Sequence, residues 1–343
     1  MSHTTINKSK ILITGGTGSW GHELVKQLLE KYPDVEEIRI YSRGEHKQVS
    51  MRQEFKNHPK LKFIIGDVRD KNILNYAMAG VDIVFHLAAL KHVPVCEENT
   101  WEAVLTNING TQNVIEAALN NKVKKIVDVS TDKAVDPFNL YGMTKACGEK
   151  LMINSNFNYS FNEKEYAPSF ICIRGGNVIG TNGSVIPLFK KQLIEKNRIT
   201  VTELEMTRYL MSTREAISLI FTAVENSIGG ELFVMNMPAA TVQTIANVMI
   251  TLFGNKDSQI DIMGKRPGEK THEVLVSKNE CPFTYIFSDN YYVVLPQIHD
   301  EKLQKRYKDY KKLNLSEFTS ENTTRLSEDE LVALLKKESW LWP

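Results

Sequence analysis

One tyrosine and one lysine are spaced so that they could act together on a proton. In the segment YGMTK, Tyr141 and Lys145 stand four residues apart, which places them on one face of a helix. A phenol with a pKa near 10 is a poor base at neutral pH, but an ammonium group one turn away favours the phenolate, as would the cation of an oxidised nicotinamide. We therefore predict that Tyr141 is the base for a hydroxyl group that is oxidised by hydride transfer.

A glycine-rich turn near the N-terminus could hold a phosphate-bearing cofactor. The segment GGTGSWG, residues 15–21, follows an apolar stretch and opens a helical one. Glycines let the backbone turn tightly and approach a pyrophosphate, and a helix N-terminus supplies N–H donors and a positive dipole. Between a strand and a helix this spacing is a strong signal for a dinucleotide, and an ordinary strand-to-helix turn is the alternative.

The end of the second predicted strand bears on which dinucleotide binds. Ser42 and Arg43, with Lys47 nearby, stand where an NAD-binding chain carries an acid for the ribose 2′-hydroxyl. A guanidinium suits a 2′-phosphate, so we predict NADP; the alternative is that Arg43 stacks on the adenine without discriminating. After the third strand, Asp67 could bond the adenine amino group or serve only as a cap.

Apolar strands and amphipathic helices alternate along the first half of the chain. Near-continuous apolar stretches predict strands at 11–14, 37–42, 61–66, 81–89, 125–131 and 170–175. Helical periodicity predicts helices at 20–32, 101–121 and 140–153. This alternation indicates an α/β fold with a Rossmann-like, doubly wound parallel sheet.

After residue 176 the alternation weakens. Here we predict helices at 184–196, 213–226, 244–253 and 327–337, and a strand at 260–262. Residues 154–165, rich in Asn, Ser and charge, are predicted to form a surface insertion. The length of 343 residues suggests about two domains. We expect a dinucleotide-binding domain over 1–176 that takes back parts of 206–240, and a smaller, discontinuous α/β substrate-binding domain mainly from 177–343.

The composition argues against several classes of protein. Lys and Arg number 42 against 41 Asp and Glu, a net charge of +1, so we expect neither nucleic acid nor membrane as the main partner. The four cysteines are widely spaced without a CxxC pair, which favours a reducing compartment and argues against a zinc site. No apolar run approaches about 20 residues and the N-terminus has no signal-peptide pattern, so we expect a cytoplasmic protein without a metal.

Nearly the whole chain resembles the extended short-chain dehydrogenase/reductases. Within them it is most similar to the inverting UDP-N-acetylglucosamine 4,6-dehydratases of the pseudaminic acid pathway. The motifs that carry the resemblance are ITGGTGSWG, IYSRGEHKQ, HLAALKHVPVCE, STDKAVDPFNLYGMTK, NVIGTNGSVIPLF, MTRYLMS and GKRPGEKTHEV. The pair Asp132-Lys133 is the most diagnostic, because related sugar 4-epimerases lack it and retaining dehydratases have Asp-Glu there.

The resemblance implies a mechanism. Oxidation at C4 makes the C5 hydrogen acidic, Lys133 removes it, and Asp132 protonates the departing C6 hydroxyl; hydride then returns to C6. Lys133 must be neutral to act as a base, so we expect burial or neighbouring cations to lower its pKa. The alternative for both residues is a solvated turn after a strand.

Further site residues follow from the resemblance. Thr131 joins the catalytic group. The cofactor group comprises Gly15, Thr17, Gly18, Ser19, Trp20, Gly21, Ser42, Arg43, Lys47, Asp67, Val68, Ala88, Ala89, Thr106, Ser130, Tyr141, Lys145 and Val178. The substrate group comprises Lys91, Asn177, Val185, Arg208, Arg266 and Glu269, any of which could instead form a surface salt bridge. His86, inside an apolar strand, is expected to be a packed core histidine. A homo-oligomer, dimer or hexamer, is also implied.

Two residues depart from the family pattern. The family commonly has Tyr at the place of Gly175 and Arg at the place of Asn182. The first departure predicts more space near the sugar or nicotinamide, and the second a missing cation. Both leave the exact UDP-sugar and the C5 outcome open. Alternative functions are a dehydratase that retains C5 or stops at the 5,6-ene, a UDP-sugar 4-epimerase, and an NADP-sensing binding protein.

Overall fold

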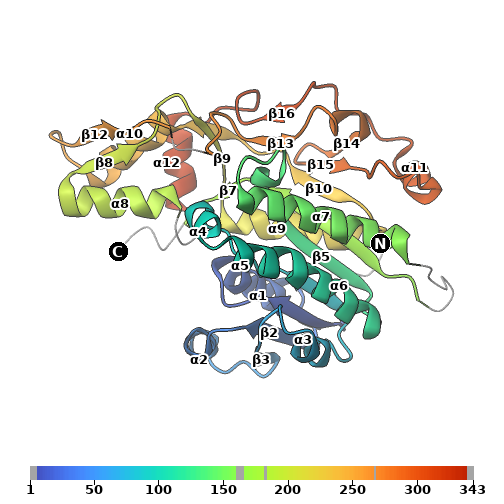
Figure 1. Ribbon diagram of the computed structural model, residues 1–343. Helices are drawn as coiled ribbons and strands as arrows, with labels where there is room; N and C mark the ends of the chain where they lie inside the picture. Colours follow the sequence, from blue (N-terminus) through green and yellow to red (C-terminus); the bar gives the residue numbers. More distant parts are fainter. Residues whose placement is uncertain (1–5, 160–165, 181–183, 266–267, 338–343) are drawn as a thin grey trace.

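A nine-stranded, mostly parallel sheet forms the centre of the computed structural model, which describes residues 6–159, 166–180, 184–265 and 268–337 (Figure 1). Its strands are β1 (Lys10–Thr14), β2 (Glu37–Ser42), β3 (Leu61–Ile65), β4 (Ile83–His86), β5 (Lys125–Thr131), β6 (Ser169–Gly175), β10 (Leu232–Met235), β14 (Thr284–Ser288) and β15 (Tyr291–Val294). The order is β14-β15-β10-β6-β5-β4-β1-β2-β3. The first six strands therefore follow the doubly wound order 3-2-1-4-5-6, which confirms the predicted Rossmann-like α/β class.

Helices cover both faces of this sheet. The first half supplies α1 (Ser19–Lys31), α2 (Glu45–Glu54), α3 (Lys71–Ala77), α4 (Val93–Glu98), α5 (Thr100–Val104), α6 (Gly110–Asn120) and α7 (Leu140–Asn158). Among them α6 packs on α7, while α1 packs on α9 (Thr213–Asn226) from later in the chain. The predicted helix at 101–121 is α5 and α6 joined by a π-helical turn at Leu105–Asn109.

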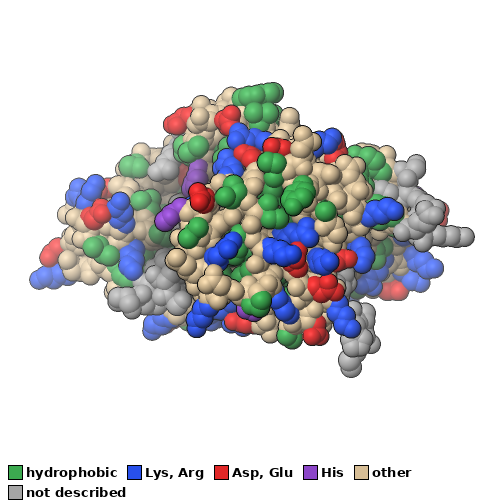
Figure 2. Space-filling model, turned by 90° about the horizontal axis from the view of Figure 1, so that it is seen from below, with side chains coloured by type: hydrophobic (Ala, Val, Ile, Leu, Met, Phe, Trp, Pro, Cys, Tyr) green, Lys and Arg blue, Asp and Glu red, His purple; other side chains and the backbone are tan. Residues whose placement is uncertain are grey.

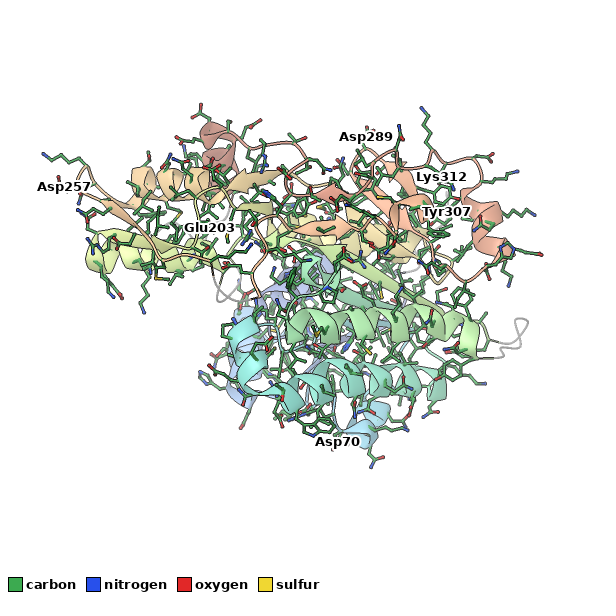
Figure 3. The ribbon with its side chains drawn as sticks, turned by 45° about the horizontal axis from the view of Figure 1, so that its top comes forward. Asp70, Glu203, Asp257, Asp289, Tyr307 and Lys312 are labelled. Carbon is green, nitrogen blue, oxygen red and sulfur yellow. The ribbon has the colours of Figure 1, made fainter. Side chains whose placement is uncertain are left out.

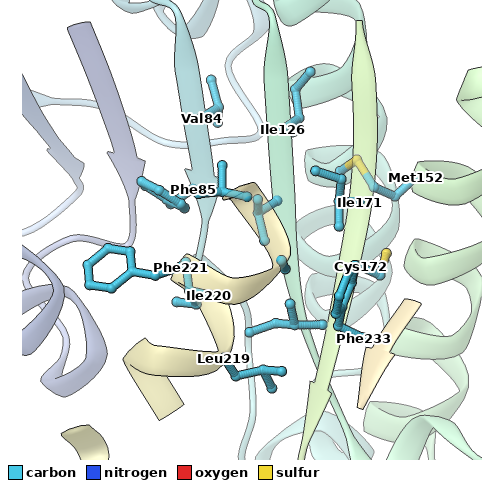
Figure 4. Close-up of a cluster of buried hydrophobic side chains, with 14 of the residues drawn as sticks. Val84, Phe85, Ile126, Met152, Ile171, Cys172, Leu219, Ile220, Phe221 and Phe233 are labelled. Atoms are coloured by element: carbon cyan, nitrogen blue, oxygen red, sulfur yellow. The ribbon is translucent and has the colours of Figure 1, made fainter. Parts of the chain in front are cut away.

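The main core lies between the sheet and these helices. Figure 4 shows Val84 and Phe85 of β4, Ile126 of β5 and Ile171 of β6 beside Leu219 to Phe221 of α9. Helix α9 begins with a capping box in which Ser212 and Glu215 bond each other's backbone N–H groups. Its apolar face then follows helical spacing, so local signals and burial agree on this element.

A second, smaller core lies beside the first. Its elements are α8 (Val185–Lys196), α10 (Val242–Phe253), α12 (Glu328–Lys336), β8 (Arg198–Val201) and β12 (Gln259–Ile262), gathered at one end of the molecule in Figure 1. Asp257 lies at the tip of this end with Glu203 further inward, whereas Asp70 lies at the bottom of the view, on the part formed by the first half of the chain (Figure 3). The remaining elements are β13 (Val274–Val276), α11 (Glu301–Tyr307) and β16 (Phe318–Thr319).

A small sheet separates the two cores. It has the order β11-β9-β7, with β7 at Asn177–Val178, β9 at Thr207–Met211 and β11 at Ala239–Thr241. Along β9, Tyr209 and Met211 belong to the first core, and Leu210 belongs to the second. Because successive side chains of a strand point to opposite faces, one strand serves both cores.

The prediction of a surface insertion at 154–165 is wrong in its first part. Helix α7 continues to Asn158, because Asn156 ties the helix end to the next strand: its amide group bonds both the N–H of Phe170 (3.1 Å) and its carbonyl (2.8 Å). Residues 160–165 lie outside the described residues.

The chain also returns to the first sheet where no return was predicted. Strands β14 and β15 pair antiparallel with each other, and β15 pairs with β10, so residues 284–294 form one edge of the sheet. Basic and acidic side chains are interspersed over the face in Figure 2, as the near-zero net charge leads one to expect. Within the described ranges, no helix combines the length and apolar character that a bilayer crossing requires.

Candidate active site

A cavity of about 1470 Å³ lies at the carboxyl ends of the parallel strands. The loops after β1 to β6 and the first turns of α7 line one part of it, and residues of β7, α8, β8, β9, α10 and the segment around Glu273 line much of the rest. The carboxyl edge of a doubly wound sheet is where such folds bind ligands. Every predicted cofactor residue lines this cavity.

The glycine turn has the geometry that a pyrophosphate requires. Gly15 has φ +66°, and a Cβ there would lie 2.9 Å from the Ala88 backbone. A Cβ on Gly21 would lie 2.1 Å from the carbonyl oxygen of Gly16. No side chain caps α1, whose cap residue is Gly18, so its first N–H groups face the cavity without a side-chain acceptor. An anion at this helix N-terminus fits all three observations.

Two buried hydroxyl groups in the lining of the cavity have no hydrogen-bond partner among the described residues. They are the Oγ1 atom of Thr106 and the Oγ atom of Ser130. A buried hydroxyl group without a partner is costly, so a ligand that bonds these two would stabilise the site.

At the end of β2 the charges are arranged around Asp67. Its carboxylate accepts hydrogen bonds from the backbone and guanidinium of Arg69, and lies 3.9 Å from Nη1 of Arg43. Burial would raise the pKa of Asp67, but Arg69 and Arg43 outweigh it and lower the pKa. The helix that follows is capped by Asp70 and not by Asp67, so the capping alternative for Asp67 is wrong. The Arg43 side chain is 59% exposed and lines the cavity with Lys47.

The pair Asp132-Lys133 is not a solvated turn. Asp132 is 1% exposed in a 3₁₀ turn at Asp132–Ala134, and its Oδ1 accepts hydrogen bonds from Lys133 Nζ (3.0 Å) and Thr131 Oγ1 (2.9 Å). Its Oδ2 is buried without a hydrogen-bond partner among the described residues. Lys133 and Thr131 line the cavity, whereas Asp132 lies behind them.

The expected lowering of the Lys133 pKa is wrong. Burial alone would lower it, but the carboxylates of Asp132 and Glu273 outweigh burial and raise the pKa above its ordinary value. The two acids outweigh the one cation, Lys270, that also acts on this amine. In this arrangement Lys133 is an ammonium group in an ion pair.

Tyr141 and Lys145 both reach the cavity from the first turns of α7, as their spacing predicts. Lys145 is buried and bonds both oxygens of Asp128 at 3.2 Å, which keeps its pKa raised although burial opposes this. Burial raises the pKa of Tyr141, and the charges of Lys145 and Lys133 only partly offset that rise. The predicted lowering by Lys145 is therefore present but is not the dominant effect.

Polar core residues hold the loops that carry the site. The carboxamide of Asn107 bonds both the N–H (2.8 Å) and the carbonyl (2.9 Å) of Leu90, and it also donates to Thr144. His86 is 1% exposed and bonds Thr14 Oγ1 (2.7 Å) and Thr111 Oγ1 (3.2 Å). Its place in the core is as predicted.

The predicted substrate residues lie on the other part of the lining. Lys91, Asn177, Val185, Arg208 and Glu269 all line the cavity, and Arg266 lies outside the described residues. Arg208 is 8% exposed, with Glu269 Oε1 at 3.3 Å and Glu273 Oε1 at 3.7 Å, so the alternative of a surface salt bridge is wrong for it. Asn177 lies 3.4 Å from Lys133 Nζ.

Two features of this lining were missed. Glu273 lines the cavity, although sequence reasoning gave it no role; its place at the end of the motif GKRPGEKTHEV was the signal available. Gly175 does not open the predicted space, because a Cβ there would lie 2.4 Å from the Met211 methyl group, which fills the position. Asn182 lies outside the described residues.

Comparisons with known proteins agree on the family. A model described as "Polysaccharide biosynthesis protein" matches residues 11–295. A "UDP-glucose 4-epimerase" of Rickettsia canadensis is 43% identical over 330 residues, covering 95% of this chain and 94% of its own. A "UDP-N-acetylglucosamine 4,6-dehydratase (inverting)" of Campylobacter jejuni is 43% identical over 293 residues, covering 85% and 84%.

Solved structures agree on the fold. Pen from Bacillus thuringiensis superposes with a TM-score of 0.87 at 34% identity, covering 97% of this chain and 99% of its own. The dTDP-glucose 4,6-dehydratase DesIV from Streptomyces venezuelae, solved with NAD and TYD, has a TM-score of 0.69 at 23% identity, covering 76% and 86%.

Proposed function

The chain belongs to the polysaccharide biosynthesis protein family, within the extended short-chain dehydrogenase/reductases, and we propose from this premise that it is an NADP-dependent, inverting UDP-N-acetylglucosamine 4,6-dehydratase. The product would be UDP-2-acetamido-2,6-dideoxy-L-arabino-hex-4-ulose. Membership supports an enzyme of the dehydratase and epimerase class; the geometry of the site supports the narrower choice.

The cofactor assignment rests on the residues that would hold it. The turn at Gly15 and the uncapped α1 suit a pyrophosphate, and Arg43 with Lys47 suits a 2′-phosphate. A bound nicotinamide would accept hydride from C4 and return it to C6, so the reaction would need no second oxidant.

Tyr141 would take the proton of the C4 hydroxyl. Burial holds this phenol neutral at rest, and Lys145 is fixed as a cation by Asp128. A second positive charge beside Tyr141, such as the oxidised nicotinamide ring carries, would favour the phenolate further. Thr131, which hydrogen-bonds to the Tyr141 side chain, stabilises the phenolate as well.

Lys133 and Asp132 would carry out the elimination with one proton that they already share. At rest the proton is on Nζ, 3.0 Å from Oδ1 of Asp132. When substrate excludes water, its transfer to Oδ1 neutralises both groups and yields the amine base and the carboxylic acid that the step requires. Lys133 then takes the C5 proton, while Asp132 releases its proton to the C6 hydroxyl by way of Thr131, and water departs. The ion pair is thereby restored.

This ion pair, in which Lys133 lines the cavity and Asp132 is buried behind it, is the single observation that carries the proposal. A 4-epimerase needs to oxidise and reduce C4 only, so it has no use for a second acid and base at the pyranose. The epimerase names of the Rickettsia relatives make that activity the second candidate.

The test is the fate of UDP-N-acetylglucosamine in D2O, followed by NMR. We expect a 4-keto-6-deoxy sugar with deuterium at C5 and the inverted configuration. A mixture of the gluco and galacto sugars, with C5–H retained and no loss of water, would contradict dehydration and support the epimerase.

Three further expectations remain proposals. We propose a cofactor-binding domain over 1–176 with parts of 206–240, and a substrate-binding domain mainly from 177–343; the separate second core supports the division. We also propose a homo-oligomer, dimer or hexamer, and a cytoplasmic location.

A further inference from the structure

Glu273 lies between two cations of the cavity. Its Oε1 is 3.8 Å from Nζ of Lys133 and 3.7 Å from Nε of Arg208. The residue is 4% exposed and lines the cavity. One buried carboxylate thus touches both the amine assigned to C5 and the guanidinium assigned to the substrate.

The backbone of Glu273 is fixed on both sides by one serine. Its N–H donates to Ser320 Oγ at 2.8 Å, and its carbonyl accepts from the N–H of Ser320 at 2.8 Å. Ser320 Oγ in turn lies 2.6 Å from Thr207 Oγ1, the residue next to Arg208. These bonds fix the Glu273 backbone relative to β9, and Arg208 is a residue of the same strand.

We propose that Glu273 is a positioning residue that fixes Lys133 and Arg208 relative to each other and keeps Lys133 protonated in the resting enzyme. The proposal deepens the proposed dehydratase function and rests on it. The two carboxylates then have different roles. Asp132, whose Oδ1 is 3.0 Å from Nζ of Lys133, exchanges the proton with the amine. Glu273 raises the affinity of Lys133 for that proton.

The charged neighbours of both groups support this division. Lys133 faces Asp132, Glu273 and Tyr141, and the cation of Lys270 also acts on it. Glu273 faces Lys133, Asp132, Arg208 and Lys270; burial raises its pKa, and the cations oppose that rise. A carboxylate about 4 Å from an ammonium group in a water-poor site favours the charged amine strongly, so its removal makes the amine easier to deprotonate.

The test measures the reactivity of Lys133 without substrate. Full-length protein is labelled with a trace of acetic anhydride at pH 8, and peptide mass spectrometry gives the labelling of Lys133 relative to Lys91 in the same cavity. The Lys133 side chain is 27% exposed, so the reagent can reach it. In Glu273→Gln we expect this ratio to rise by about tenfold, because a fall of one unit in the pKa of Lys133 increases the fraction of uncharged amine about tenfold.

Glu269→Gln is the matched control, because Glu269 contacts the same guanidinium but has no ion pair with Lys133 in the described structure. We expect its ratio to equal that of the wild type. An unchanged ratio in Glu273→Gln, or an equal rise in Glu269→Gln, overturns the proposal. Lys145, 3% exposed, reports folding: it must stay unlabelled. If Glu273→Gln does not fold, the labelling ratio of the wild-type protein is the test. A wild-type Lys133 that is labelled as readily as Lys91 overturns the proposal.

The catalytic readout is the pH profile of kcat. The falling limb, which reports the loss of the proton that Lys133 and Asp132 share, should move to lower pH by about one unit in Glu273→Gln and stay in place in Glu269→Gln. A merely structural loss would lower kcat at all pH values without moving the limb, and would overturn the proposal. If the wild type dehydrates no UDP-sugar, the proposed function fails, and the labelling result still decides the role of Glu273.

Discussion

Two groups of residues line the same cavity, and they differ in what fixes their positions: local backbone geometry in one and long-range contacts in the other. The glycine lining, made of Gly15, Gly18, Gly21 and Ala88, is small and uncharged, and its shape is set by backbone geometry within one turn and one strand end. The charged lining, made of Lys133, Arg208, Glu269, Lys270 and Glu273, is set by contacts between segments far apart in the chain. The difference indicates that binding of the cofactor and elimination chemistry can be damaged separately.

We expect Lys133→Ala to have the largest effect, because it should slow the elimination and leave cofactor binding intact. Removing the C5 base should slow dehydration by about 10²–10⁴-fold, the usual contribution of a positioned general base, while NADP binding stays as in the wild type. The measurements are NMR of the sugar and fluorescence titration of NADP. Lys150→Ala, an exposed lysine on the same α7 that carries Tyr141, is the control and should keep full activity. Equal turnover in both variants would remove Lys133 from the mechanism.

We expect Gly21→Ala to damage the glycine lining instead, and with it the stability of the fold and cofactor binding. The new Cβ would lie 2.1 Å from the Gly16 carbonyl oxygen, so the turn must shift. We expect a loss of about 3 kcal/mol in the free energy of unfolding, the upper end for overpacking, and weaker NADP binding. Urea denaturation and NADP titration measure both. In Gly44→Ala the Cβ would meet nothing closer than 3.8 Å, so the loss should stay below about 1 kcal/mol, the cost of replacing the glycine at the N-cap of α2. Equal losses in the two variants would contradict the steric argument.

A pH-dependent loss of stability should arise beneath the glycine lining, at His86. Burial lowers the pKa of His86 to about 4, against about 6.5 in the unfolded chain. The unfolded chain therefore binds the extra proton, and this contribution to stability is complete above pH 6.5 and is lost as the pH falls toward 4. Between pH 7.5 and 5 the expected loss is about 2 kcal/mol.

The measurement is urea denaturation across that pH range in the wild type and in His86→Asn. The variant should be less stable at pH 7.5, because the bonds to Thr14 and Thr111 are altered, but its stability should change less with pH. Parallel curves for the two proteins would show that His86 does not titrate in this way.

The smallest effect is expected at the edge of the glycine lining, in Arg43→Ala. The side chain is 59% exposed, so its contribution is screened by solvent. We expect NADP affinity to fall about tenfold and NAD affinity to stay the same, since only NADP offers a 2′-phosphate. Calorimetric titration of both cofactors checks this. Equal losses for the two would mean that Arg43 contacts the adenine and does not discriminate.

The same contrast explains what could be predicted from the sequence. The glycine turn, the first six strands and the faces of Tyr141 and Lys145 follow from spacing over a few residues, and all were predicted at or near their places. The charge of Lys133 was predicted wrongly, because Glu273 stands 140 residues away and only the fold brings it within 3.8 Å. Asn156 extended α7 for the same kind of reason, through a bond to a strand that follows the region of 160–165.

The route of the chain through the first sheet has a consequence for biosynthesis. Strand β6 has its outer neighbour, β10, only after 56 intervening residues, and β15 closes the edge only at residue 294. While the ribosome is still making these residues, first β6 and then β10 presents an unpaired edge that other chains could join. The nascent protein is therefore most exposed to misassembly late in translation, and a chaperone that shields that edge should raise its yield.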